Sequence, residues 1–189
     1  MSDAFSYISE PVGRRLIIAM SELMNEKEMD DITTSEILAR YGISRSTFYR
    51  RYRDKYDLLT HNYEQLMNQT VMQIGKGMSY RTAFRSLYST ISKDPDFFGR
   101  ALRSTAPNGL RNFITERSLG LFEELLTKYG LDLEDPYYHM LYHGYVYGAI
   151  EVTCIWAQEG MKIPVDKLLH ICYELMPHEM QTCMALEYM

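Results

Sequence analysis

The sequence predicts an all-α protein, and three observations support this fold class. Apolar residues recur at three- and four-residue steps, as in Val12, Leu16, Ala19, Met20 and Leu23, which is the spacing of one helix face. The period-two alternation of a half-buried strand is missing throughout the chain. The later breaks between periodic segments, SKDP, APNG, KYGLDLEDP and EGMKIP, contain Pro or Gly, both of which interrupt helices. We therefore expect about nine helices, and 189 residues are enough to bury a full core.

The first two predicted helices have recognisable ends. The first spans about 11–28, and Pro11 is tolerated in its first turn. Thr33 and Glu36 then fit a capping box, in which each side chain accepts a hydrogen bond from the other residue's backbone amide. The second helix is short and stops at Gly42, because glycine can take the left-handed conformation of a helix end.

The third helix follows Ser44, a good capping residue, and runs from Arg45 to about Arg51. A short break leads into a long helix from about 55 to 76, which ends near two glycines. Five further helices are predicted at 79–92, 95–104, 109–129, 135–159 and 165–187. Pro177 should kink or split the last of them.

Charge is distributed unevenly along the chain and suggests two domains. The whole chain carries a net charge of -5, whereas the segment from Arg40 to Lys55 holds six basic residues and one carboxylate. Residues 58–189 contain 11 Lys and Arg against 15 Asp and Glu, together with long helices rich in Tyr and Met. We therefore expect a basic head at residues 1–57 and a separate helical domain at 58–189. An anionic partner would bind the head only, because charges beyond about 8–10 Å are screened at physiological salt.

The two short helices on either side of Gly42 have the spacing of a helix-turn-helix. In that motif the second helix enters the major groove of double-stranded DNA with its N-terminal residues facing the bases. Arg45 can contact a guanine through two hydrogen bonds, and the hydroxyls of Ser46 and Thr47 can donate or accept. Phe48 and Tyr52 would face inward and anchor this helix.

Phosphate contacts are expected from the residues around that helix. These residues are Tyr49, Arg50, Arg51 and Lys55, with Thr34 and Ser35 at the start of the preceding helix. A basic helix pair can also be an ordinary solvated surface. The combination of capping box, short helix, Gly turn, Ser cap, aromatic anchor and basic exit favours DNA binding over that alternative.

The stretch "TTSEILARYGISRSTFYRRYRDKYDLL", residues 33–59, resembles the DNA-binding motif of the tetracycline-repressor (TetR/AcrR) family of bacterial transcription regulators. The similarity lies in the set of residues rather than in any one of them. It consists of Thr33, Glu36-Ile37, Gly42-Ile43-Ser44, Thr47-Phe48-Tyr49, Tyr52, Lys55 and Leu58-Leu59. Leu38 and Tyr41 depart from the pattern, because the family usually has alanine there, and we expect the first short helix to pack at a slightly different angle.

The resemblance implies a homodimer that binds a pseudo-palindromic operator. It also implies a small-molecule effector of unknown identity, bound in the C-terminal domain, that changes the spacing of the two reading heads. The last two helices would pair with their mates in the dimer, and Gly144, Gly148 and Ala149 would let a helix approach closely. These helices could instead complete the core of a monomer. The Met and aromatic residues suit an adaptable pocket, although such stripes also occur in ordinary cores.

Other functional classes find little support in the sequence. His139 and His143 share a helical face, but Met140 stands where a zinc protease needs Glu, so we expect no metal site and no cofactor. His170, His178, Cys154 and Cys172 are the remaining metal-ligand candidates. We expect no enzyme, because the chain has no P-loop and no G-x-S-x-G motif.

We expect the protein in the cytoplasm and not in a membrane. No apolar run reaches about 18 residues, and the first residues do not have the pattern of a secretion signal. The three cysteines are few and far apart, which is typical of reduced thiols. The leading hypothesis is a sequence-specific transcriptional regulator that acts as a repressor and is released by its small-molecule effector. The alternative is a related coactivator or adaptor that acts through a protein partner.

Overall fold

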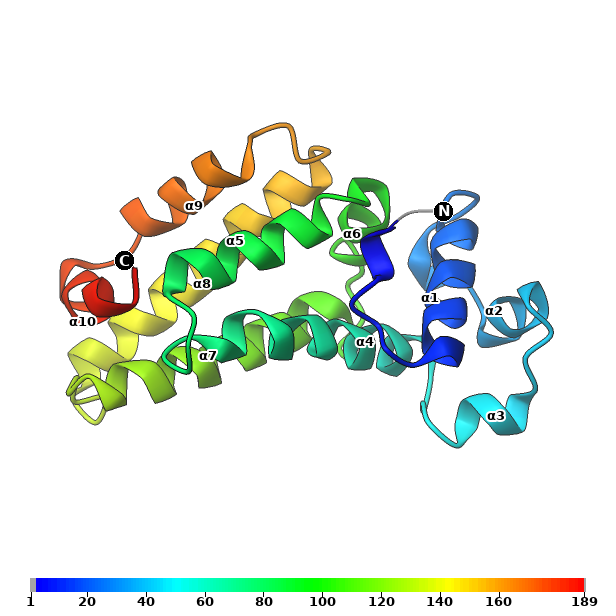
Figure 1. Ribbon diagram of the computed structural model, residues 1–189, viewed down its shortest axis with the longest axis horizontal. Helices are drawn as coiled ribbons and strands as arrows, with labels where there is room; N and C mark the ends of the chain where they lie inside the picture. Colours follow the sequence, from blue (N-terminus) through cyan, green and yellow to red (C-terminus); the bar gives the residue numbers. More distant parts are fainter. Residues whose placement is uncertain (1–2, 189) are drawn as a thin grey trace.

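The computed structural model describes residues 3–188, and within that range it contains ten α-helices and no strand. The all-α prediction is therefore confirmed. Figure 1 shows α1, α2 and α3 gathered at one end of an elongated molecule, while the remaining helices form a larger body. We call these parts the head (α1–α3) and the body (α4–α10).

The helices lie close to their predicted positions. The head consists of α1 (Pro11–Met24), α2 (Thr34–Arg40) and α3 (Arg45–Tyr49), with the 3₁₀ turns η1 (Asp3–Phe5) and η2 (Met29–Asp31). The body begins with α4 (Lys55–Gln69), η3 (Val71–Gln73), α5 (Tyr80–Ile91) and α6 (Pro95–Ala101). It continues with α7 (Leu110–Lys128), α8 (Pro136–Gln158), α9 (Val165–Glu174) and α10 (His178–Tyr188).

Two helices, α1 and α4, end at least four residues earlier than expected. α1 stops at Met24 rather than near residue 28, because the next four residues are polar and Met29 is buried in η2 instead. α4 stops at Gln69 rather than near the glycines. The Thr70 hydroxyl donates to the Leu66 carbonyl oxygen at 2.6 Å, a side-chain bond that competes with regular helix geometry.

The final helix is split, as predicted from Pro177. α9 ends at Glu174 and α10 begins at His178, which raises the number of helices from nine to ten. The Gln181 side-chain amide donates to the Tyr173 and Met176 carbonyl oxygens at 3.2 and 2.8 Å. These bonds satisfy carbonyl groups that a continuous helix would have satisfied itself.

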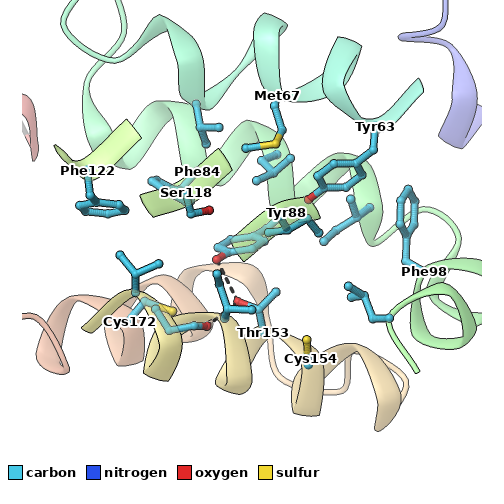
Figure 2. Close-up of a pocket in the computed structure, with 18 of the residues that line it drawn as sticks. Tyr63, Met67, Phe84, Tyr88, Phe98, Ser118, Phe122, Thr153, Cys154 and Cys172 are labelled. Carbon is cyan, nitrogen blue, oxygen red and sulfur yellow. Dashed lines mark hydrogen bonds between the residues drawn. The ribbon is translucent and has the colours of Figure 1, made fainter. Parts of the chain in front are cut away.

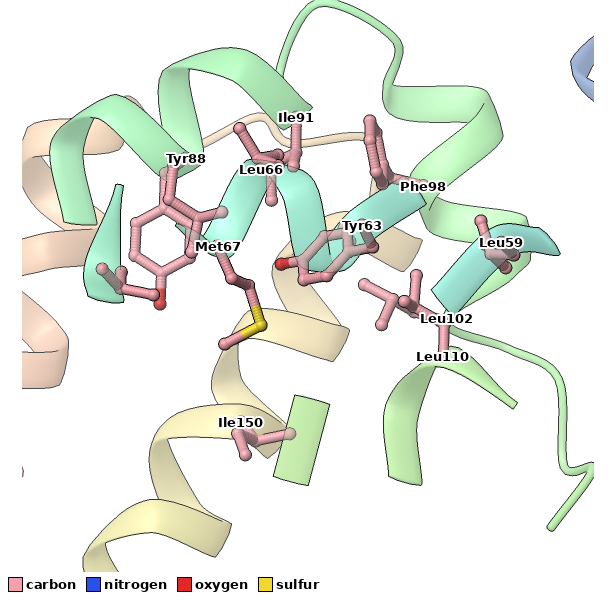
Figure 3. Close-up of a cluster of buried hydrophobic side chains, with 14 of the residues drawn as sticks. Leu59, Tyr63, Leu66, Met67, Tyr88, Ile91, Phe98, Leu102, Leu110 and Ile150 are labelled. Carbon is pink, nitrogen blue, oxygen red and sulfur yellow. The ribbon is translucent and has the colours of Figure 1, made fainter. Parts of the chain in front are cut away.

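α4 is the central helix of the molecule, since it leaves the head and runs into the body (Figure 1). Its buried side chains Leu59, Tyr63, Leu66 and Met67 recur at three- and four-residue steps. They pack against side chains of α5, α6, α7 and α8 in the cluster drawn in Figure 3. The predicted domain boundary at residue 57 thus falls inside one continuous helix. None of the helices in residues 3–188 combines the length and the apolar character that a membrane span requires.

Candidate nucleic-acid interface

The start of α2 is fixed by the predicted capping box. The Glu36 amide donates to Thr33 Oγ1 at 3.3 Å, and the Thr33 amide donates to Glu36 Oε2 at 2.8 Å. The Lys27 ammonium donates to the other carboxylate oxygen of Glu36 at 2.6 Å. The hydrogen bond from Lys27, followed by those from Thr33, lowers the pKa of Glu36 to about 2.

The turn between α2 and α3 depends on Gly42. Its φ is 62°, a left-handed conformation that costs little only for glycine. The following amide, that of Ile43, donates to the Leu38 carbonyl oxygen at 3.0 Å and so closes the end of α2. The predicted role of Gly42 as a helix end is therefore confirmed.

The N-terminal edge of α3 is held by Ser44. Its hydroxyl accepts from the Thr47 amide at 3.1 Å and lies 3.0 Å from the Ser46 hydroxyl and 2.9 Å from the Thr47 hydroxyl. Below this edge, Phe48 and Tyr52 are buried, as predicted, and their rings lie 5.5 Å apart. A five-residue helix thus has a fixed start and an aromatic anchor.

The residues predicted to contact bases lie together on this edge. Arg45 and Ser46 are exposed and Thr47 is half-buried. The Arg45 guanidinium donates to the Ser35 hydroxyl at 3.0 Å, which brings the starts of α2 and α3 together.

The residues predicted to contact phosphates lie in several different environments. Ser35, Tyr49, Arg50 and Arg51 are exposed, and Thr34 is half-buried. Tyr49 packs its ring edge against Phe48 at 5.1 Å while 55% of its surface stays open to solvent.

Carboxylates from outside the basic segment neutralise part of it. Arg40 pairs with Glu26 at 2.6 Å, Arg51 with Glu10 at 2.7 Å and Arg53 with Asp57 at 3.2 Å. Within residues 3–188, the guanidinium groups of Arg45 and Arg50 form no such pair. The positive field is therefore narrower than the sequence suggests, and it is centred on α3.

Lys55 requires a correction. It was expected to contact a phosphate, but the structure buries it, with its ammonium donating to the carbonyl oxygens of Met29, Asp30 and Ile32 at 2.8, 2.6 and 2.7 Å. Its three donors are thus committed to the fold, where they tie η2 to the start of α4. Its partners lie 23 to 26 residues earlier in the chain, so no local sequence pattern reveals this placement.

The two departures from the family pattern both contact α1 or the core. Leu38 is buried. The Tyr41 hydroxyl donates to Glu22 at 3.0 Å, and the Arg15 guanidinium lies 5.4 Å from the centre of the Tyr41 ring. The Tyr41 side chain thus contributes to the contact between α1 and the end of α2.

Together these features define a helix-turn-helix DNA-binding domain. Residues 16–61 match the sequence profile of the bacterial regulatory proteins of the tetR family. This segment, from within α1 to within α4, is therefore the N-terminal helix-turn-helix domain of the TetR family, as the resemblance implied. Among curated proteins, no match to the chain was found.

The head and body are joined through η2 and the segment that follows α6. The hydroxyls of Ser104 and Tyr56 both donate to Asp30 Oδ1, at 2.6 and 2.8 Å. These bonds, that of Ser104 first, lower the pKa of Asp30. Burial, and then the Asp30 carboxylate, raise the pKa of Tyr56 to about 12. Arg100 of α6 adds an ion pair to Glu28 at 3.3 Å.

The body contains a cavity whose lining the sequence could not identify. Its volume is about 50 Å³, and its walls come from α4, α5, α7, α8 and α9, with contributions from α6 and the residue after it (Figure 2). Phe98 of α6 and Leu102, the residue after α6, are among the lining residues. Residues two positions apart thus line the cavity and hold the head.

Of the histidines considered as metal ligands, His139 and His143 lie on α8, His170 on α9 and His178 on α10. The rings of His139 and His143 lie 4.3 Å apart, and a nitrogen of His143 lies 2.9 Å from the His139 carbonyl oxygen. In the described part of the chain, no three His, Cys, Asp or Glu side chains meet as a metal site would require.

Proposed function

We propose that this protein is a sequence-specific DNA-binding transcriptional regulator. The observation that carries the proposal is the exposed N-terminal edge of α3, which Ser44 holds in place. Arg45, Ser46 and Thr47 would contact base edges in the major groove. The phosphate contacts would come from Thr34, Ser35, Tyr49, Arg50 and Arg51, whereas Lys55 is removed from this set.

We further propose a homodimer formed through α8 and the end of the chain. Met140 is 70% exposed and borders an apolar groove with Gly144 and Leu175. A Cβ atom added at Gly144 would meet nothing within 4 Å, so a second helix could approach closely. Large exposed apolar surfaces are typical of interfaces. A two-fold dimer would present two heads to a pseudo-palindromic operator.

Release from DNA would follow from a change in the body. Phe98 and Leu102 line the cavity, while Arg100 and Ser104 hold η2 of the head. A ligand that enlarges the cavity would favour a different position of α6 and thus a different spacing of the heads. This arrangement supports a repressor that a small-molecule effector releases.

Selection of bound sequences from a random pool of DNA duplexes tests the proposal. We expect a palindrome, because each head of a two-fold dimer would read one half-site. Affinity for the selected site should fall steeply with salt, with a log–log slope near -0.9 for each phosphate neutralised. No enrichment, together with no binding at low salt, would contradict DNA reading and favour the adaptor that acts through a protein partner.

A further inference from the structure

The cavity in the body contains no charged side chain among its lining residues. Aromatic and aliphatic groups form most of the wall, together with Met67, Ser118, Thr153 and two cysteines. Burial raises the pKa of the Cys154 and Cys172 thiols to about 11, so both are neutral at pH 7. A charged ligand would lose its hydration here without gaining a counter-ion, which is unfavourable in an apolar environment.

Most hydroxyl groups at the cavity are already paired with one another. The Tyr88 hydroxyl lies 3.1 Å from Thr153 Oγ1, as the dashed line in Figure 2 marks. The hydroxyls of Tyr80 and Tyr145 lie 2.9 Å apart. These pairs brace α5 against α8 and do not need a ligand.

The hydroxyls of Tyr63 and Ser118 are not paired in this way, and of these two residues only Tyr63 is buried. It projects from α4 towards the space enclosed in Figure 2, and only 4% of its surface is exposed. Its ring packs against Phe98 at 6.2 Å, yet its hydroxyl forms no hydrogen bond to another residue of the described chain. Buried hydroxyls normally have a partner, so an unpaired one facing a cavity points to a bound group.

The size of the cavity limits what can enter without movement. About 50 Å³ holds a few water molecules, since one water needs roughly 10–15 Å³. A larger ligand would have to displace flexible side chains, and Met67 is suited to this because its unbranched side chain has three rotatable bonds.

We infer that the cavity binds an uncharged, mostly apolar small molecule that carries one hydrogen-bonding group for the Tyr63 hydroxyl. The inference deepens the proposed function, on whose effector response it rests. Because no charged side chain lines the cavity, it disfavours ions, and its aromatic walls favour flat apolar groups. Among such molecules, Tyr63 favours those that carry a polar group within reach of its hydroxyl.

Two pairs of probes test this ligand class on the full-length protein. N-phenyl-1-naphthylamine and 8-anilinonaphthalene-1-sulfonate share a ring system but differ by a sulfonate. We expect the neutral probe to bind one site per chain, at least about ten-fold tighter than the anion, because the cavity offers the anion no counter-ion. Equal or tighter binding of the anion would overturn the assignment of an uncharged ligand.

Naphthol and naphthalene differ by one hydroxyl and test the role of Tyr63. We expect Tyr63→Phe to lower the affinity for naphthol about five-fold, the effect of one lost hydrogen bond, and to leave the affinity for naphthalene unchanged. Equal effects on both compounds, or none, would overturn the role of Tyr63.

Two further measurements test separately where the probe binds and whether the protein binds DNA. Ala149→Phe should fill the cavity and abolish binding of the neutral probe, whereas Ala149→Ser should retain it, with folding of both variants checked by circular dichroism. Probe binding that survives in a folded Ala149→Phe variant would overturn the location. If the protein binds the neutral probe selectively but does not bind DNA, the proposed function is contradicted and the ligand assignment of the cavity stands. If it binds DNA but neither probe, the ligand assignment is contradicted and the proposed function stands.

Discussion

The ammonium of Lys55 lies among three backbone carbonyl oxygens at distances of 2.6 to 2.8 Å. The carbonyls of Met29 and Asp30 belong to η2 and that of Ile32 follows it, and the Met29 carbonyl also accepts from the Ile32 amide at 3.2 Å. A single side chain thus neutralises the polar end of a turn and fixes the entry of α4. At this position a basic residue of a DNA-binding motif acts on stability.

Replacement of Lys55 by Met should therefore destabilise the protein. The substitution leaves the Asp30 and Ile32 carbonyls without the Lys55 donor, whereas that of Met29 keeps the Ile32 amide, and we expect a loss of about 2–4 kcal/mol in the free energy of unfolding, measured in urea. Arg53→Ala is the matched control, because that side chain is 88% exposed and its pair with Asp57 contributes little. Equal stability of Lys55→Met and the wild type would contradict this role.

The Glu36 carboxylate makes the stability of the head depend on pH. Its pKa is lowered to about 2 in the fold, against about 4.3 in an unfolded chain. A lowered carboxyl pKa contributes stability that is fully present above the unfolded value and is lost as the pH falls through the folded one. Urea midpoints between pH 6 and pH 2 should therefore fall less steeply for Glu36→Gln than for the wild type. Parallel curves would show that Glu36 does not carry this effect.

At the scale of elements, α3 depends on the residue that caps its start more than a longer helix would. It has five residues, and Ser44 supplies the only side-chain cap observed at its start. Ser44→Ala should cost about 1 kcal/mol of stability and also lower affinity for the selected DNA site, since the reading edge loses its support. Ser46→Ala keeps the cap and should retain stability. A Ser44→Ala variant with wild-type stability and DNA affinity would refute the role of the cap.

The helices were largely predictable because their ends carry local signals. Thr33, Gly42 and Ser44 determine the motif through bonds between near neighbours, which a sequence pattern can reveal. Lys55 and Arg51 could not be assigned in the same way. Their partners, Met29 and Glu10, are distant along the chain, so only the fold reveals that one is buried and the other is paired. The cavity likewise forms where several helices meet.

At the scale of the whole molecule, the body would serve both as dimer interface and as sensor. The exposed apolar face lies on α8 near Gly144, whereas the cavity lies between α8 and the helices on its other side. One helix thus separates the proposed partner from the proposed ligand. α6 then links the cavity to the head.

A large charged side chain at Gly144 should disrupt the dimer. We expect Gly144→Arg to elute as a monomer in size-exclusion chromatography with light scattering, because the arginine would fill the space needed by the partner helix. Gly120→Arg on α7 is the matched control, since Gly120 is also exposed and unobstructed. The proposed interface would be wrong if Gly144→Arg remained dimeric.

The central claim is that the edge of α3 reads the base sequence, and a titration of three variants tests it most directly. Arg45→Ala, Arg50→Ala and the distant control Arg85→Ala should be titrated against the selected duplex and a scrambled one at one salt concentration. We predict that Arg45→Ala loses about 1–3 kcal/mol on the selected duplex alone, that Arg50→Ala loses equally on both, and that Arg85→Ala matches the wild type. Equal losses of Arg45→Ala on the two duplexes would contradict the claim.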